Sequence, residues 1–525
     1  MALTDNSSGF APPQGRTTAA LRTALNTGSL ALPVKIFLVC VVLPFAFGLG
    51  PVVLTGVRIV LLFLIPVMAV RLISGKAGKM LPADVLFFLH WLWIGVTIGI
   101  HNPDSAIQNV GATGVEFLGG YFLGRTFIRN KEDFIGLIRF SVLLVTLTLP
   151  FAVFETLTGR PILIEILNSV PGIKGAVRAY SEQRLGLNRV QMGFATPIHY
   201  GIYCTIAFSF CYFGLKGVYS SFKRYLATTV IFACVFFSLS SGALLPVMLQ
   251  LAMIIWAFFL RNNPKRWWYL LGWIAFCYVT IDLLSNRTPY RVFMTYATFS
   301  PGTAYWRAAI NQFGMDNVWE HPFIGIGFNY WKRPSWMQAN SVDNFWLLMA
   351  MRHGIPAFLL VAAGYGAALW QVIFAKLGDG DTVLLRLRLA WVFTFFSLAL
   401  TLNTVHIWSE IYALIFFHIG AGMWLVGHGP VTADDAAVAA GPQLRVAPVT
   451  SRPSAHTPAA SRAVATPAVV DRSPAPGHTR SPQTLRATPV PGPAFRPAQS
   501  TPEAEPEEVQ RHTRFPSRPR DPGNS

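Results

Sequence analysis

The sequence predicts an all-α polytopic membrane protein with about twelve transmembrane helices and a large, partly helical loop between the ninth and tenth spans. Three observations carry this prediction. Only 13% of the 525 residues are charged, whereas soluble domains carry about 25%. Apolar residues make up 53% of the chain. Apolar runs long enough to cross a bilayer recur along most of it. Together they exclude an ordinary soluble enzyme, a coiled coil and a mainly disordered protein.

The candidate spans are continuous apolar runs rather than alternating patterns. Helices are expected for such runs, because a backbone in lipid must satisfy its own hydrogen bonds. The predicted spans are about 33–50, 52–71, 82–100, 107–124, 135–156, 195–215, 226–241, 243–260, 268–285, 355–375, 387–403 and 410–427.

The distribution of Lys and Arg predicts the orientation of these spans. One set of short loops is rich in both residues, and the other set, at 101–106, near 242 and at 404–409, holds neither. Basic short loops stay on the cytoplasmic side, so both chain termini are expected in the cytoplasm. Two long loops, about 157–194 and 286–354, then lie on the far side of the membrane.

Three regions follow from the composition. Residues 1–30 form a polar cytoplasmic segment, 31–427 the membrane domain, and 428–525 a Pro/Ala/Arg-rich cytoplasmic tail expected to be disordered. The net charge of +18 is spread over loops and tail, so it indicates the membrane rather than a nucleic acid as partner. All five cysteines lie in apolar segments without a CxxC motif, and neither a metal site nor another cofactor is expected.

The predicted loop 286–354 is the richest candidate for a functional site. It is dense in Arg, Trp, Tyr, Gly and Pro, and a loop of this length in a compact protein is usually functional or disordered. Its aromatic content argues against disorder. Trp306 and Trp331 offer flat amphipathic faces that suit a sugar ring or the membrane interface, and the sequence leaves both readings open.

Several motifs in this region resemble one family. The segment HPFIGIGFNYW (321–331) is followed by SVDNFWLLMAMRHGIPAFLL (341–360), and TAYWRAAI (303–310) precedes both. Earlier in the chain stand NRVQMGFATPIHYG (188–201) and SLSSGALLPVML (238–249). In order and spacing these motifs resemble the O-antigen ligase-like superfamily, which includes O-antigen ligases and Wzy-type polysaccharide polymerases. The resemblance extends over the predicted membrane domain.

The resemblance implies a metal-independent glycosyltransferase of the bacterial inner membrane. Its donor would be a glycan on undecaprenyl pyrophosphate, its acceptor a glycan or a lipid, and other polysaccharide assembly proteins are candidate partners. Ligases of this kind carry a His-Asn pair where this chain has Asp343-Asn344, which favours an exopolysaccharide polymerase over a ligase. A glycan transporter or flippase is the alternative of another class, but the sequence shows no pair of related halves.

Arginines are the expected ligands of a pyrophosphate leaving group. The guanidinium binds phosphate oxygens in a bidentate manner and keeps its charge. Arg307 is predicted as catalytic, and Arg189, Arg291, Arg178 and Arg333 as substrate-binding residues. The alternative for each arginine is a headgroup contact or a loop ion pair.

The acceptor hydroxyl needs a base. Asp343 is predicted to be that base, with capping of the following helix as the alternative. Asn344 is expected either to orient substrate or to cap the helix. His321 is a second candidate base, against a purely structural role in the turn that follows it. Gly325 and Gly327 indicate a tight turn rather than a nucleotide phosphate loop, because the strand–helix context of such a loop is missing.

Overall fold

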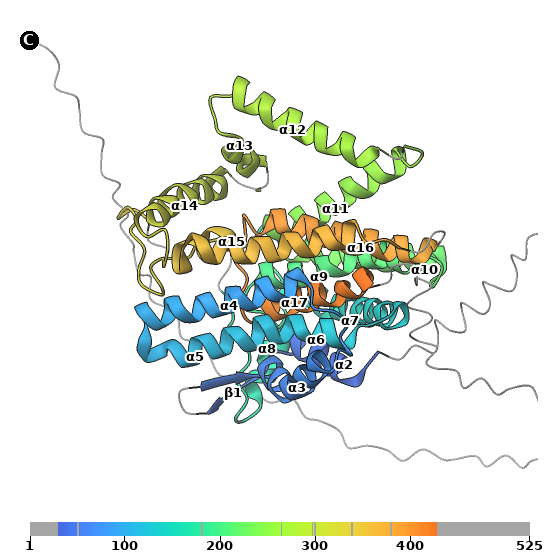
Figure 1. The fold of residues 1–525 in the computed structure, drawn as a ribbon, viewed down its shortest axis with the longest axis horizontal. Coiled ribbons are helices and arrows are strands. Elements are labelled where there is room, and N and C mark those ends of the chain that lie inside the picture. The colour runs from blue at the N-terminus through green and yellow to red at the C-terminus, as the bar shows by residue number, and fades with distance from the viewer. Residues whose placement is uncertain are drawn as a thin grey trace, which may run out of the picture. The chain divides into compact units, whose positions relative to one another are not determined.

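The computed structural model describes residues 30–49, 52–179, 182–263, 265–296, 298, 301–337, 340–377 and 381–427. This part is mostly helical, with one two-stranded sheet (Figure 1). The predicted tail 428–525 and nearly all of the segment 1–30 lie outside the described residues.

Eight of the described helices are long and apolar enough to cross a membrane. This confirms a multi-pass α-helical membrane protein, although with fewer full-length spans than the twelve predicted apolar runs. The eight are α3 (Gly56–Ile73), α4 (Pro82–His101), α7 (Lys131–Thr158), α11 (Ser241–Phe259), α12 (Arg266–Leu284), α15 (Phe345–Ile373), α16 (Thr382–Thr401) and α17 with the following turn η3 (Ser409–Gly427).

The predicted span 33–50 is wrong in its second half. Helix α2 (Leu32–Val42) ends just before Leu43 and Pro44, and strands β1 (Ala46–Leu49) and β2 (Val52–Thr55) follow as an antiparallel hairpin. The reason is local, because a residue that precedes proline disfavours the helical conformation. The apolar composition continues past this point, but the helix does not.

The predicted span 107–124 lies inside a continuous helical stretch that contains a π-helical turn. It consists of α5 (Pro103–Gly114), the π-helical turn η1 (Val115–Gly119) and α6 (Gly120–Phe127). In η1, the Glu116 carboxylate pairs with Arg58 of α3 at 2.8 Å. Helix α6 packs against α17 with almost no space between the backbones, since a Cβ on Gly124 would lie 2.0 Å from the Phe417 carbonyl oxygen. Small residues allow this approach of two helices.

The next apolar runs also fold as helices. Helix α8 (Ile162–Ser169) lies in the predicted loop 157–194. The run 195–215 forms α9 (Pro197–Ser209) with the π-helical turn η2 (Phe210–Gly214), and the run 226–241 forms α10 (Ser221–Phe237).

Most of the predicted loop 286–354 is helical. It contains α13 (Pro289–Tyr296) and α14 (Pro301–Glu320), which connect α12 to α15 (Figure 1). Helix α15 begins at Phe345, ten residues before the predicted span. The predicted start near 355 instead coincides with a kink at Gly354, where φ is +79°. The backbone of Gly354 is not helical, so α15 consists of two helical segments joined at this kink, and the second segment begins where the span 355–375 was predicted to begin.

Several helix ends meet at one side of the bundle. The Phe345 amide at the start of α15 donates hydrogen bonds to the carbonyl oxygens of Leu402 (2.8 Å) and Val405 (3.1 Å), which follow α16. Gly242, in the first turn of α11, lies against Val405. These contacts hold the first turns of α11 and α15 next to the loop between α16 and α17.

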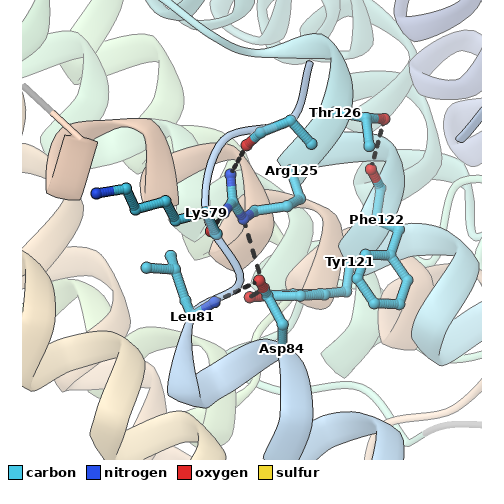
Figure 2. Close-up of polar contacts among 8 residues, drawn as sticks. Lys79, Leu81, Asp84, Tyr121, Phe122, Arg125 and Thr126 are labelled. Carbon is cyan, nitrogen blue, oxygen red and sulfur yellow. Dashed lines mark hydrogen bonds and ion pairs between the residues drawn. The ribbon is translucent and has the colours of Figure 1, made fainter. Parts of the chain in front are cut away.

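A buried charged network joins α4 to α6 (Figure 2). The Arg125 Nε atom lies 3.4 Å from Asp84 Oδ1, and Arg125 Nη2 donates to the Lys79 carbonyl oxygen at 2.7 Å. Asp84 also accepts hydrogen bonds from the Tyr121 hydroxyl (2.5 Å) and the Leu81 amide (2.8 Å). Asp84 and Arg125 are almost inaccessible to solvent, so these contacts compensate for their lost hydration.

Candidate functional site

Arg307 is a buried cation on α14 whose charge is incompletely paired. The residue is 7% exposed. Two of its guanidinium nitrogens, Nε and Nη1, are buried without a hydrogen-bond partner among the described residues. Leaving such donors unpaired costs free energy. An anion that meets this guanidinium would recover that cost.

The Arg307 guanidinium lies at the serine-rich turn before α11. Its Nη2 atom is 3.5 Å from the position that a Cβ on Gly242 would occupy. Glycine at this position therefore lets a guanidinium from α14 approach the first turn of α11. The motifs TAYWRAAI and SLSSGALLPVML, which are separate in sequence, meet at this point.

Two further arginines reach the same turn from the segment before α9. Arg184 Nη1 donates a hydrogen bond to the Leu239 carbonyl oxygen at 2.9 Å. Arg189 Nε donates to the Ser238 carbonyl oxygen at 3.4 Å. The structure thus brings Arg184 and Arg189 together with Arg307 around one turn, which forms a cationic site. The cluster of Arg184, Arg189 and Arg307 is called the arginine site below.

The arginine site is electrostatically strained. Burial, together with the charge of Arg184, lowers the pKa of Arg189 to about 10. Burial also lowers the pKa of Arg307, and the Asp343 carboxylate acts in the opposite direction. A phosphate or pyrophosphate group would relieve the repulsion among these three guanidinium groups. Among the described residues, no group of three or more His, Cys, Asp or Glu side chains is arranged to hold a metal ion.

Asp343, which directly precedes the N-cap of α15, interacts electrostatically with Arg307. The carboxyl group is largely enclosed, and this burial raises its pKa above 3.8, while Arg307 lowers it. The N-cap of α15 is Asn344, whose Oδ1 accepts a hydrogen bond from the Leu347 amide at 3.0 Å. The alternative in which Asp343 caps the helix is therefore wrong, and the alternative in which Asn344 caps it is confirmed. The Asp343 carboxylate is left available for chemistry.

Tyr290 is a component of the site that sequence reasoning missed. It lies at the beginning of α13, and its hydroxyl hydrogen-bonds with the Asn344 side chain. Burial raises its pKa to about 12, with Asn344 and Arg307 acting in the opposite direction. The phenol thus keeps its proton at neutral pH. The sequence carries no signal for it beyond the aromatic density of this region.

A cavity of about 260 Å³ opens next to Asp343. Asp343 and Trp331, two of the predicted site residues, line it. Its wall also includes three side chains that the sequence did not single out, namely Arg352, His406 and Trp408. They come from α15 and from the loop before α17.

The kink in α15 determines the backbone conformation around Arg352, which lines the cavity. Pro356 has no N–H for the Arg352 carbonyl oxygen, and the Ile355 amide donates instead to Pro322, at 2.7 Å. The carbonyl oxygens of Met351 and Arg352 are consequently free of their usual helical partners.

The turn after α14 supplies the missing donors. The Ile326 amide donates to Met351 O and the Gly327 amide to Arg352 O, both at 2.9 Å. Gly325 and Gly327 have φ of +66° and +63°, which confirms the tight-turn interpretation. The HPFIGIG and RHGIP motifs are therefore two halves of one junction, which fixes the position of Arg352.

Three predicted arginines lie outside the arginine site. Arg291 is exposed and donates to Gln312 at 3.0 Å. Arg178 is exposed and donates to the Gly159 carbonyl oxygen at 2.7 Å. Arg333 donates to Met337 O (2.8 Å) and to Asn340 Oδ1 (2.9 Å). In this state each binds its own loop or a neighbouring loop or helix.

The remaining candidates are distributed along α14 and the turn beyond it. His321 is exposed and follows the end of α14, about 21 Å along the helix axis from Arg307 at 1.5 Å per residue. Trp306 stacks on Trp336, with ring centroids 5.7 Å apart. Trp331 is buried, and its indole N–H donates to the Asn340 carbonyl oxygen at 3.2 Å. Of these three, Trp331 reaches the cavity beside Asp343.

One family model matches part of the chain. Residues 226–362 match the family model Wzy_C, described as O-Antigen ligase. The matched segment includes the serine-rich turn, Arg307, Asp343 and Arg352. No curated protein matches the chain. The family match supports a function of the O-antigen ligase or polymerase type. The described helices are those of a multi-pass membrane protein, and residues 226–362 are similar to the O-antigen ligase family, as the motifs predict.

Proposed function

We propose that this protein polymerises glycans carried on undecaprenyl pyrophosphate, at the periplasmic face of the bacterial inner membrane, as an exopolysaccharide polymerase. The observation that carries the proposal is the buried Arg307 guanidinium with two unpaired nitrogens, grouped with Arg184 and Arg189. A pyrophosphate leaving group is an anion that such a site would bind.

The chemistry is a displacement at the anomeric carbon of the donor glycan. An acceptor hydroxyl oxygen forms the new bond to this carbon while the bond to the pyrophosphate oxygen breaks. The arginine site stabilises the charge that develops on the leaving pyrophosphate, without a metal ion. The Tyr290 phenol, which keeps its proton, is available as a further hydrogen-bond donor.

Asp343 is proposed as the base that takes the proton of the acceptor hydroxyl. Its carboxyl group lines the cavity and interacts electrostatically with Arg307. The acceptor would therefore lie in the cavity, and the donor pyrophosphate at the arginine site. Asp343 stands at the boundary of the two, where the hydroxyl must lose its proton.

The proposed topology has twelve spans, with both termini in the cytoplasm. It is supported by the loops at the end of the helices away from the arginine site, which carry many basic residues. The polyprenyl chain of the donor would lie between spans, in the membrane. Other polysaccharide assembly proteins are proposed partners.

A ligase that transfers the finished glycan to lipid A core or another acceptor is the second candidate, favoured by the description of the matching family. Both reactions use the same donor and the same leaving group. They differ in the acceptor, so the product distribution distinguishes them.

The test compares lipid-linked and surface glycans in cells that carry the wild-type chain, Arg307→Gln or Arg287→Gln. Arg287 is an exposed arginine of the same region and serves as the matched control. With Arg307→Gln, single repeats on the lipid carrier indicate a polymerase, and long chains stranded on the carrier indicate a ligase. Unchanged glycans with Arg307→Gln at equal protein levels would contradict the proposed enzyme.

A further inference from the structure

We propose that the cavity beside Asp343 is an acceptor subsite for an acidic sugar, whose carboxylate is bound by Arg352. This inference rests on the proposed function and specifies its substrate class. The cavity is lined by one carboxylate, one guanidinium, aromatic rings and amide side chains.

Arg352 is the cation that lines this cavity, and among the described residues its charge has no counter-ion. Its guanidinium lies 5.2 Å from the centroid of the Phe328 ring. None of the ion pairs formed by the described residues includes Arg352. Asp343 lines the same cavity, but the charge that acts on its carboxyl group is that of Arg307. A partly enclosed guanidinium without an anion is suited to bind a carboxylate in bidentate geometry.

The rest of the wall suits a sugar ring. Trp331 and Trp408 supply flat apolar surface, and Asn329 and Asn340 supply amide groups for hydroxyls. Burial lowers the pKa of His406 to about 3, and Arg352 contributes in the same direction. His406 is therefore neutral, and adds a hydrogen-bonding group to the cavity rather than a second positive charge.

The size and polarity of the cavity restrict the ligand. At about 260 Å³ it is smaller than the roughly 300–1,000 Å³ of sites for drug-sized molecules, which fits one sugar ring better than an oligosaccharide. The Asp343 carboxylate repels an anion on its own side of the cavity. An acidic sugar would therefore bind with its acid group at Arg352 and a hydroxyl at Asp343, which is the orientation that transfer requires.

The position of Arg352 is fixed by the backbone, not by side-chain packing alone. Its carbonyl oxygen accepts the Gly327 amide at 2.9 Å, and the kink at Gly354 and Pro356 follows directly. A guanidinium held on such a junction loses little conformational freedom when a ligand binds.

The test measures binding to the full-length protein in detergent, by saturation-transfer NMR and calorimetry. The probes are methyl β-D-glucuronide, methyl β-D-glucoside and glucose 6-phosphate. The glucuronide is expected to bind at least about tenfold more tightly than the glucoside, which corresponds to about 1.4 kcal/mol. Arg352→Gln should abolish this preference, Arg352→Lys should keep part of it, and Arg287→Gln should leave it unchanged. Tighter binding of glucose 6-phosphate than of the glucuronide would assign the site to a phosphorylated sugar and overturn the carboxylate assignment.

Two outcomes separate this inference from the proposed function. If the wild-type protein shows no preference for the glucuronide, or if Arg352→Gln keeps the preference while its thermal unfolding is unchanged, the acidic-sugar subsite is wrong. If the preference depends on Arg352 but Arg307→Gln leaves cellular glycans unchanged, the subsite stands and the proposed transfer reaction fails.

Discussion

Arg307 of α14 reaches the first turn of α11 at Gly242, where its Nη2 atom lies 3.5 Å from the position of a Cβ on that glycine. The same Cβ would lie 2.6 Å from Val405 Cγ2. Gly242 is therefore the point at which α11, α14 and the loop before α17 approach one another. The absence of a side chain there allows the arginine site to form.

Gly242→Ala is expected to reduce activity more strongly than it reduces stability. The added methyl group must displace Val405, whose β-branched side chain is stiff, and this loop also binds the start of α15. Overpacking of this kind costs about 1–3 kcal/mol. Thermal unfolding and cellular glycan length would be measured together, with Gly272→Ala of α12 as the control, because no atom lies within 4 Å of a Cβ at that glycine. Full activity of Gly242→Ala would show that the turn tolerates the shift.

Asp343→Asn is expected to lower the transfer rate by about 10²–10⁴-fold, as the loss of a general base does. The carboxylate is the active form, so the wild-type rate should fall as the pH falls through its pKa. Burial raises that pKa, so the loss begins at a higher pH than for an exposed aspartate. The measurement is the initial rate against pH with extracted lipid-linked glycan. If the Asp343→Asn variant has the wild-type rate and its rate still falls at low pH as in the wild type, Asp343 is not the base.

Asn344→Ala is expected to destabilise the protein by about 1 kcal/mol, because α15 loses its N-cap. Asn344→Ser should restore part of the stability through its own hydroxyl acceptor. Asp343→Ala is the matched comparison, since it removes the adjacent polar side chain but leaves the cap. Thermal unfolding in detergent ranks the three variants. A larger loss for Asp343→Ala than for Asn344→Ala would contradict the assignment of the cap.

Asp84→Leu is expected to destabilise the protein by about 3–5 kcal/mol, because it leaves the Arg125 charge buried without its partner. The double variant Asp84→Leu, Arg125→Met should lose less than Asp84→Leu alone, since neither charge then remains. Glu165→Gln, in the exposed pair with Arg160, is the control and should not change thermal unfolding measurably. A double variant less stable than Asp84→Leu would show that Arg125 acts mainly through the carbonyl groups it binds.

The sequence by itself determined the helical membrane class and most helix positions. Hydrophobicity acts locally along the chain, and every predicted apolar run contains helix in the structure. One local backbone conformation could also be predicted, since Gly325 and Gly327 indicated a tight turn and both have positive φ in the structure. The prediction failed near Pro44, where the apolar pattern continues but the helix ends.

Only the tertiary structure decided which charged groups meet. It brought Arg184 and Arg189 to the turn that Arg307 reaches, and it left Arg291 on an exposed surface with a bond to Gln312. It also assigned the cap to Asn344 rather than Asp343, and it placed the Asp343 carboxyl group where the charge of Arg307 acts on it. Residue type alone cannot distinguish these arginines. Whether an arginine lies inside or outside the arginine site depends on how helices distant in the chain pack against one another. A single sequence contains no direct record of that packing.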